Sequence, residues 1–228
     1  MKIVVAGENS LILYFSDDAN KNTLSRIQQA VSVIKEQFKS VLIDLIPSYA
    51  SVLVIYNPIK TNQHFMYSQL QSLFANSDLY APSPSSQGKT VTIPVYYAME
   101  TGTDLEELAK HAHIDINDVI DIHQSTEYHV YAIGFAPGFA FLGHVDERIA
   151  YPRKATPRKK VAKGSVAIAD RQTAVYPRIS PGGWNIIGRS PIEMFNPANN
   201  PTMPVSIGDT VRFEAISKNK FLSLGGIL

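Results

Sequence analysis

Basic side chains concentrate in one stretch of the sequence. Between Arg148 and Ser190 the chain carries ten Lys or Arg residues and one acidic residue, Asp170. Such a block is in many proteins a solvated face, but it also suits a concave site for a carboxylate, a phosphate or an acidic partner. Arg153 and Arg158 each follow a proline, whose fixed φ stiffens the backbone beneath the guanidinium. Guanidiniums held in this way are suited to bidentate contacts with a carboxylate or phosphate, which favours the anion site.

Neutral hydrogen-bonding groups follow the two arginines. The segment "RQTAVYP" offers Gln172, Thr173 and Tyr176, which are side chains of the kind that fix the orientation of a bound ligand. We therefore expect Arg153, Arg158, Gln172, Thr173 and Tyr176 to bind the substrate.

Two segments place a proline before a glycine and end in an aromatic residue, "APGF" at Ala136–Phe139 and "SPGGW" at Ser180–Trp184. Each predicts a type II turn, in which glycine supplies the positive φ. The aromatic rings either pack into the core or line an apolar wall where a ligand or partner approaches the glycine backbone. The residues that we expect at this cleft or partner interface are Phe135, Pro137, Gly138, Phe139, Pro181, Gly182, Gly183 and Trp184.

Titratable side chains alternate in "EYHVY". Glu127, His129 and Tyr131 share one face of a predicted strand, where a carboxylate, an imidazole and a phenol are able to transfer protons. Glu127 and His129 are thus the candidate catalytic residues. A structural hydrogen-bond ladder explains the same spacing, and we prefer that interpretation.

The sequence lacks the motifs of several other kinds of binding site and active site. The sequence contains no Walker-type phosphate loop, no G-x-G-x-x-G after a strand and no G-x-S-x-G elbow. The six histidines show no zinc-type spacing, and residues 98–101 resemble a biotin-attachment site only superficially. We therefore expect no metal, no biotin and no intrinsic cofactor.

The elements that position these residues fall into two predicted domains. Residues 1–79 follow the order ββαββα and predict a small α+β domain, with the clearest helical periodicity over residues 20–38. Residues 80–89, "YAPSPSSQGK", are rich in proline and serine and predict a linker. Residues 90–228 predict a second domain.

The second domain begins with a strand and a pair of short helices. The helices fall between Thr103 and Gln124, with a break at Ile114-Asp115 and a capping box formed by Thr103 and Glu106. Residues 100–125 carry seven acidic side chains against one lysine, which would repel nucleic acid. Short strands broken by glycine and proline follow and predict a barrel or compact sandwich. They are expected at residues 128–135, 165–169, 173–176, 185–188 and 211–216.

The overall composition is that of an ordinary globular protein. The 228 residues are 45% hydrophobic, with a formal net charge of +1, and no apolar run approaches the ~20 residues of a membrane span. Cysteine is absent, which excludes disulfides and thiol chemistry and fits a reducing compartment, with the cytoplasm as the default. We expect no membrane and no nucleic-acid partner.

Six segments, in this order and spacing, resemble the family of the 5-oxoprolinase B subunit, also called KipI-type or allophanate hydrolase subunit 1 proteins. The segments are "DLIPSYASVLVIYNP", "TDLEELAKHAHIDINDVIDIH", "EYHVYAIGFAPGFAFLG", "YPRKATPR", "KGSVAIADRQTAVYPRISPGGWNIIGRSP" and "SIGDTVRF". The resemblance spans nearly the whole chain. It implies a small α+β N-terminal domain followed by a cyclophilin-like β-barrel, similar to one half of the carboxyltransferase domain of urea carboxylase.

The resemblance also implies a function. Members of the family work with a homologous C-type subunit and an A-type subunit, and the complex hydrolyses 5-oxo-L-proline to L-glutamate at the expense of ATP. This implies a hydrolase subunit that is inactive without its partners, in a hetero-oligomer that binds ATP and a small carboxylate substrate. Some members instead inhibit a sensor histidine kinase by binding its dimerisation helices, which is the alternative function.

The chain departs from the family pattern at two places. Where relatives show "IAGxQTG" this chain has Asp170 and Ala174, and where they show "VPAGS" it has "VAKGS" at Val161–Ser165. A negative charge and a methyl group are thereby added where the backbone would approach a ligand. Either a tuned substrate pocket or a non-enzymatic relative would account for these changes.

Overall fold

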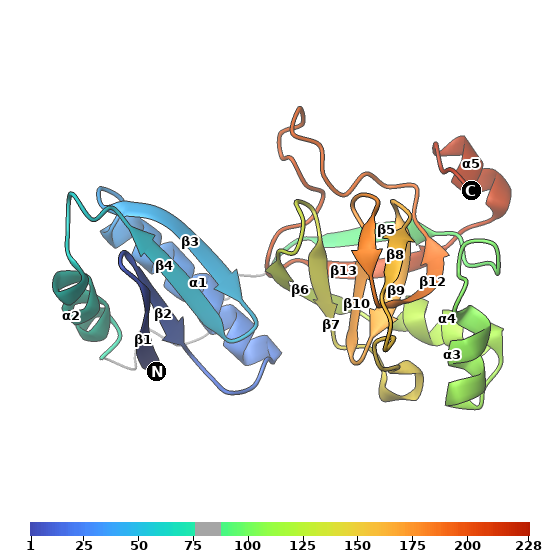
Figure 1. The fold of residues 1–228 in the computed structure, drawn as a ribbon, viewed down its shortest axis with the longest axis horizontal. Coiled ribbons are helices and arrows are strands. Elements are labelled where there is room, and N and C mark those ends of the chain that lie inside the picture. The colour runs from blue at the N-terminus through green and yellow to red at the C-terminus, as the bar shows by residue number, and fades with distance from the viewer. Residues whose placement is uncertain (76–87) are drawn as a thin grey trace. The chain divides into compact units, whose positions relative to one another are not determined.

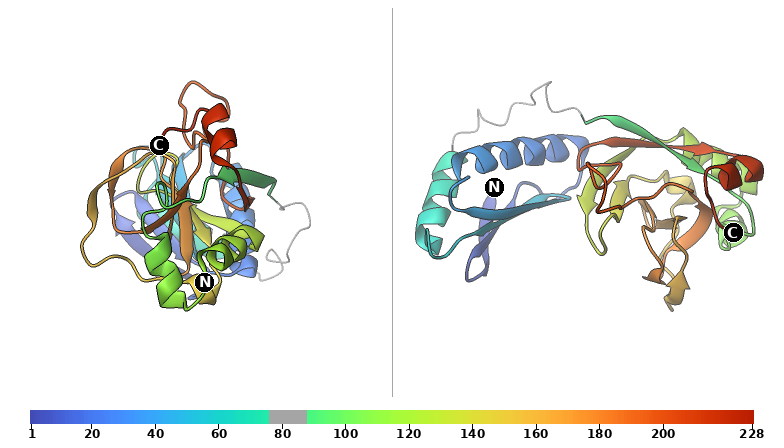
Figure 2. Two further views of the ribbon diagram at one scale, coloured as in Figure 1. Left: turned by 90° about the vertical axis from the view of Figure 1, so that its right-hand side faces the viewer. Right: turned by 90° about the horizontal axis from the view of Figure 1, so that it is seen from above.

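The computed structural model describes residues 1–75 and 88–228 (Figures 1 and 2). The chain divides into two compact units, Met1–Gln87 and Gly88–Leu228. The predicted linker, residues 80–89, lies outside the described residues except for Gly88 and Lys89. In the described parts of the chain, no helix has the length and apolar character needed to cross a bilayer.

The first unit has the predicted order ββαββα. Its strands form one antiparallel sheet in the order β1-β2-β4-β3. Its elements are β1 (Lys2–Gly7), β2 (Ser10–Tyr14), α1 (Lys21–Gln37), β3 (Leu42–Ser48), β4 (Ser51–Tyr56) and α2 (Gln63–Leu73).

The core of the first unit lies between the sheet and its two helices. Alternate residues of β2 and β4, among them Leu13 and Val54, are fully buried against apolar residues of α1 and α2. Figure 1 shows α1 running along one face of this sheet. The helix begins after Asn20, whose side chain accepts a hydrogen bond from the Thr23 N–H at 3.0 Å. One buried sheet face and one amphipathic helix stripe therefore account for this unit.

The second unit is built on a seven-stranded sheet in the order β12-β9-β10-β7-β6-β13-β5, with a separate two-stranded ribbon of β8 and β11. The elements are β5 (Thr90–Val95), α3 (Leu105–Ala112), α4 (Ile116–Ser125), β6 (Tyr128–Ile133), β7 (Ala140–Gly143), the short 3-10 helix η3 (Glu147–Ile149), β8 (Arg158–Val161), β9 (Ser165–Ala169), β10 (Gln172–Val175), β11 (Ser180–Gly182), β12 (Asn185–Arg189), β13 (Thr210–Ala215) and α5 (Lys218–Ser223).

The seven-stranded sheet curls into a nearly closed barrel. Its two edge strands meet where the Tyr96 N–H donates to the Arg189 carbonyl at 2.8 Å and the Arg189 N–H donates to the Tyr96 carbonyl at 3.0 Å. This bridge joins the two sheet edges at one point. The predicted α+β class with a β-barrel is confirmed.

The barrel strands have two apolar faces. The larger cluster takes residues from all seven strands and from α3 and α4, and it forms the interior. Residues of the opposite parity form a second cluster on the outer face: on β9, Val166 and Ile168 point inward, whereas Ala167 and Ala169 point outward. This outer cluster carries the aromatic residues singled out in the sequence.

The helix pair is placed as predicted, but its capping is not. The N-cap of α3 is Asp104, and no side-chain cap is formed there, so the predicted capping box of Thr103 and Glu106 is wrong. The capping box belongs to α4, between Asp115 and Asp118. The Asp104 carboxylate is instead engaged by side chains and backbone outside its helix.

A polar chain crosses the barrel interior at His123. The His123 side chain is fully buried, with Nδ1 2.7 Å from the Tyr97 hydroxyl and Nε2 3.0 Å from the Thr173 hydroxyl. Thr173 in turn donates to the Ala167 carbonyl at 3.1 Å. Burial lowers the pKa of His123 from 6.5 to about 3, so the imidazole is neutral over the physiological range.

We expect this buried histidine to make the second unit less stable in acid. Between pH 6.5 and pH 3, His123 is protonated in the unfolded chain but stays neutral in the folded chain. The free energy of unfolding then decreases by up to about 1.4 kcal/mol per pH unit. Urea unfolding between pH 7 and 4, followed by the fluorescence of Trp184, the only tryptophan, measures this slope. His123→Gln should flatten it, and equal slopes for both proteins would contradict the prediction.

Candidate functional site

A hollow of about 380 Å³ lies on the outer face of the barrel. Its walls come from the turn after β6, from the loop before β8, from β10 and from the segment that joins β11 to β12. The predicted residues that line it are Phe135, Phe139, Arg153, Gln172, Tyr176, Pro181, Gly182, Gly183 and Trp184. Phe141 and Pro157 complete the lining.

Aromatic rings in edge-to-face contact form the floor of the hollow. The Phe139 ring centroid lies 5.3 Å from that of Tyr176, 5.5 Å from that of Trp184 and 4.8 Å from that of Phe141, with interplanar angles of 83°, 83° and 64°. Phe139 is only 2% exposed. Such mutually oriented rings make a rigid apolar surface suited to a flat or cyclic ligand.

The turn that carries Phe139 has the geometry predicted for it. Gly138 has φ +88°, and the Phe139 N–H donates to the Ala136 carbonyl at 3.0 Å, as in a type II turn. Phe135, just before the turn, also has a positive φ, of +68°, and its side chain is 65% exposed at the edge of the hollow. A bulky residue in this conformation is unusual, and strained residues of this kind cluster at binding and active sites.

The second proline-glycine segment does not form the predicted turn. Pro181 and Gly182 lie in strand β11, and Gly182 is not in the left-handed region, so the prediction of a type II turn at this position is wrong. The glycine is needed for another reason. A Cβ at Gly182 would lie within van der Waals overlap of the Tyr176 hydroxyl, which packs directly on this backbone.

Polar groups at the hollow are few. Arg153 is exposed, and among the described residues no acidic side chain forms an ion pair with it. Burial raises the pKa of the Tyr176 phenol, and the Trp184 N–H and nearby guanidiniums oppose that shift without cancelling it. Tyr176 is therefore protonated at neutral pH, with its hydroxyl buried against the Gly182 backbone. Gln172 adds an amide.

Two residues of the predicted binding set lie elsewhere. The Arg158 guanidinium is bound to Asp104, with Nη2 2.6 Å from Oδ1, and it does not line the hollow. Thr173 is buried in the barrel interior with His123, because adjacent residues of a strand point to opposite faces. The structure thus brings Arg153, Gln172 and Tyr176 together and separates Arg158 and Thr173 from them.

The candidate catalytic residues are not at the hollow. Glu127 accepts hydrogen bonds from Arg212, and the His129 ring nitrogen Nδ1 lies 3.3 Å from the Thr210 hydroxyl. These contacts tie β6 to β13 and agree with the structural ladder. Pro137 and Gly138 are also absent from the lining, although their turn supports Phe139.

The departures from the family pattern lie outside the hollow as well. Asp170 has φ +51° in the two-residue loop between β9 and β10, a position that aspartate tolerates better than most residues. Ala174 is fully buried in the outer aromatic cluster. Lys163 pairs with Glu193 at 2.7 Å. None of these residues is among those that line the hollow.

Among the described residues, five of the ten basic side chains in the block form ion pairs with acids from outside it. Lys154 and Arg158 pair with Asp104, and Arg171 pairs with Glu147. Sequence alone could not identify Asp104 as a partner, because it lies 54 residues before Arg158. In the described residues, no group of three or more His, Asp or Glu side chains is placed to hold a metal ion.

Comparisons with known proteins agree with this architecture. Residues 1–205 match the family described as carboxyltransferase domain, subdomain C and D. The chain is 37% identical over 222 residues to the 5-oxoprolinase B subunit of Bacillus subtilis, covering 94% of this chain and 92% of that protein. It is 35% identical over 172 residues to the 5-oxoprolinase B subunit of Escherichia coli O157:H7, covering 75% and 77% of the two chains.

Solved structures show the same fold. The crystal structure of TTHA0988 matches with a TM-score of 0.79 and 30% identity over 92% of this chain, which spans 40% of that longer chain. Kluyveromyces lactis urea carboxylase matches with a TM-score of 0.77 over 97% of this chain and 22% of its own, at 18% identity, and supports the fold alone. By its near full-length match to the curated relatives, the chain belongs to the family of 5-oxoprolinase B subunits, within the carboxyltransferase-domain proteins of subdomain C and D type.

Proposed function

We propose that this chain is the B subunit of an ATP-dependent complex that hydrolyses 5-oxo-L-proline to L-glutamate together with A-type and C-type subunits. The observation that carries the proposal is the 37% identity to a 5-oxoprolinase B subunit over 94% of this chain. The names of the curated relatives refer to 5-oxoprolinase and none refers to a kinase, so the kinase-inhibitor alternative gains no support.

The hollow suits a small cyclic carboxylate. The Arg153 guanidinium, with no acidic partner among the described residues, is available for the substrate carboxylate. The Gln172 amide offers hydrogen bonds to a lactam group, and the Tyr176 ring adds to the apolar wall. The aromatic floor around Phe139 contacts the methylene side of the ring. We assign substrate binding to these four residues.

The hollow does not contain all that hydrolysis requires. No carboxylate or imidazole is among the residues that line it, so a general base must come from elsewhere. A site shared with the C-type subunit would supply one, which supports a chain that is inactive alone. We place ATP binding in the complex and assign it to no residue of this chain. The lack of cysteine is in keeping with a reducing compartment, and we place the complex in the cytoplasm.

Reconstitution tests this proposal. Co-expression of this chain with its candidate A-type and C-type partners should give a complex that releases glutamate from 5-oxo-L-proline only when ATP is present. The chain alone, and the partners without it, should be inactive. A stable complex of all three subunits that shows no turnover would count against the proposal.

A further inference from the structure

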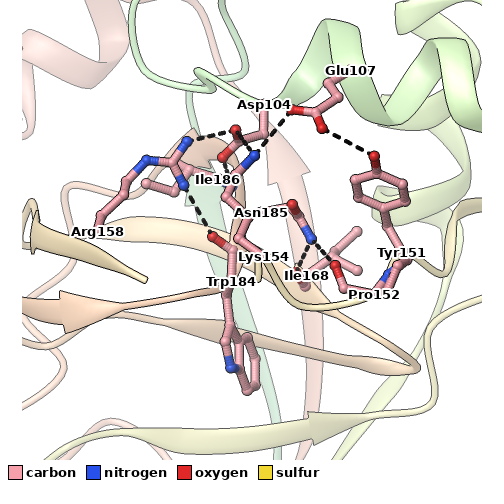
Figure 3. A network of polar contacts seen from close by, with 10 residues as sticks. All are labelled: Asp104, Glu107, Tyr151, Pro152, Lys154, Arg158, Ile168, Trp184, Asn185 and Ile186. Atoms are coloured by element: carbon pink, nitrogen blue, oxygen red, sulfur yellow. Dashed lines mark hydrogen bonds and ion pairs between the residues drawn. The ribbon is translucent and has the colours of Figure 1, made fainter. Parts of the chain in front are cut away.

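Asp104 is a buried carboxylate that contacts three separate parts of the second unit. It is 2% exposed at the start of α3. Oδ1 lies 2.6 Å from Arg158 Nη2 and 2.9 Å from Lys154 Nζ, and Oδ2 accepts the Ile186 N–H at 2.7 Å (Figure 3). The two cations come from the segment before and at the start of β8, and Ile186 comes from β12.

The carboxylate is ionised in this setting. Burial alone would raise the pKa of Asp104, but hydrogen bonds from Arg158, Lys154 and the Ile186 N–H outweigh it and lower the pKa. Asp104 therefore carries a negative charge at neutral pH, surrounded by donors on both oxygens. Such a group fixes the positions of its partners more strongly than a neutral hydrogen bond does.

The network holds the segment that carries Arg153. On one side, the Pro152 carbonyl accepts a hydrogen bond from Asn185 Nδ2 at 2.9 Å. On the other, the Lys154 N–H donates to the Gly183 carbonyl at 2.8 Å, and Lys154 Nζ pairs with both Asp104 and Glu107. Both neighbours of Arg153, Pro152 and Lys154, are thus anchored (Figure 3). Arg153 itself lines the hollow.

The segment that carries Trp184 contacts the same carboxylate through two groups. Arg158, held by Asp104, directs Nη1 at the Trp184 carbonyl at 3.5 Å. The Ile186 N–H bound to Asp104 lies two residues beyond Trp184. The Asp104 carboxylate therefore reinforces the direct hydrogen bonds between the segment of Arg153 and the segment of Trp184.

We propose that Asp104 is a positioning residue, which holds the backbone of Arg153 and the backbone of Trp184 in a fixed relative position at the hollow. The identity of the ligand in this inference rests on the proposed function. The positioning of the two segments by Asp104 does not depend on it. A buried ion pair is by itself weak evidence of a stabilising role, because apolar replacements often leave stability unchanged. The role proposed for the Asp104 ion pairs is to fix the backbone positions of Arg153 and Trp184 relative to each other.

Two variants and a control test the inference. Asp104→Asn removes the charge at nearly constant volume, and Lys154→Gln removes one anchor next to Arg153 while leaving the Asp104–Arg158 pair intact. Glu106→Gln is the matched control on the same helix, because among the described residues Glu106 forms an ion pair only with the exposed Lys110, at 2.8 Å. Hydrogen exchange of the full chain measures the mobility of residues 151–158, and steady-state kinetics of the reconstituted complex measure the KM for 5-oxo-L-proline.

Asp104→Asn and Lys154→Gln should raise amide exchange in residues 151–158 at least about tenfold, with the β9 and β10 amides unchanged. The KM should rise about tenfold while kcat changes by less than about threefold, a split that general loss of folded protein would not produce. Glu106→Gln should match the wild type in both measurements.

A folded Asp104→Asn protein with wild-type exchange and wild-type KM would overturn the inference. If Asp104→Asn does not fold, Lys154→Gln decides the question in the same way. If the wild-type complex shows no turnover, the proposed function fails, and the exchange of residues 151–158 alone decides whether Asp104 positions this segment.

Discussion

Replacing Arg153 with glutamine is expected to lower kcat/KM for 5-oxo-L-proline in the reconstituted complex by about 100-fold. Arg153 is the basic residue that lines the hollow, and the structure leaves its guanidinium for a ligand. Two charge-assisted hydrogen bonds to a carboxylate account for an effect of this size. Glutamine keeps much of the side-chain length but carries no charge and cannot form the bidentate contact.

Arg178→Gln is the matched control for this prediction. Arg178 belongs to the same basic block, is exposed and does not line the hollow, so its replacement changes the net charge equally. The two variants should show the same urea midpoint. A loss of activity that is equal in both would mean that the net charge of the block matters and that Arg153 has no specific role.

The periodicity of apolar residues predicts many of the strands and helices in the fold. The apolar run from Ser165 to Ala169 predicts a strand with the bounds that the structure shows. The three-and-four spacing of residues 20–38 predicts α1 to within one residue at each end. The ribbon of β8 and β11 was missed, because "RKKV" and "SPG" contain no apolar alternation. β8 and β11 form strands because they pair with each other, and a local sequence pattern contains no information about that pairing.

The sequence identifies the candidate binding residues by their chemical type, but it does not show which of their side chains point towards the hollow. Alternation along a strand could have separated Thr173 from Gln172, since neighbours on a strand face opposite sides. No comparable signal separates Arg158 from Arg153. Both follow prolines in one short segment, and only the distant Asp104 determines which guanidinium is neutralised. Contacts between residues far apart in sequence decide such questions, and the sequence of one chain does not show them.

Phe139→Ala is expected to destabilise the second unit by about 3–5 kcal/mol. Phe139 is 2% exposed and lies in edge contact with Phe141, Tyr176 and Trp184, so its removal leaves a cavity at the centre of the outer aromatic cluster. Neighbouring β-strands limit how far the other rings can close that space. Urea unfolding followed by Trp184 fluorescence reports on this unit alone, because the chain has no other tryptophan.

Comparing Phe135→Ala with Phe139→Ala distinguishes the contribution of the aromatic cluster to stability from its contribution to binding. Phe135 contacts the same Phe139 ring at 5.2 Å, but its side chain is 65% exposed, so its removal should cost less than about 1 kcal/mol. If the edge of the hollow contacts a ligand or the C-type partner, this variant should still reduce activity in the complex. Equal urea midpoints for Phe139→Ala and Phe135→Ala would show that the buried ring does not hold the floor of the hollow together.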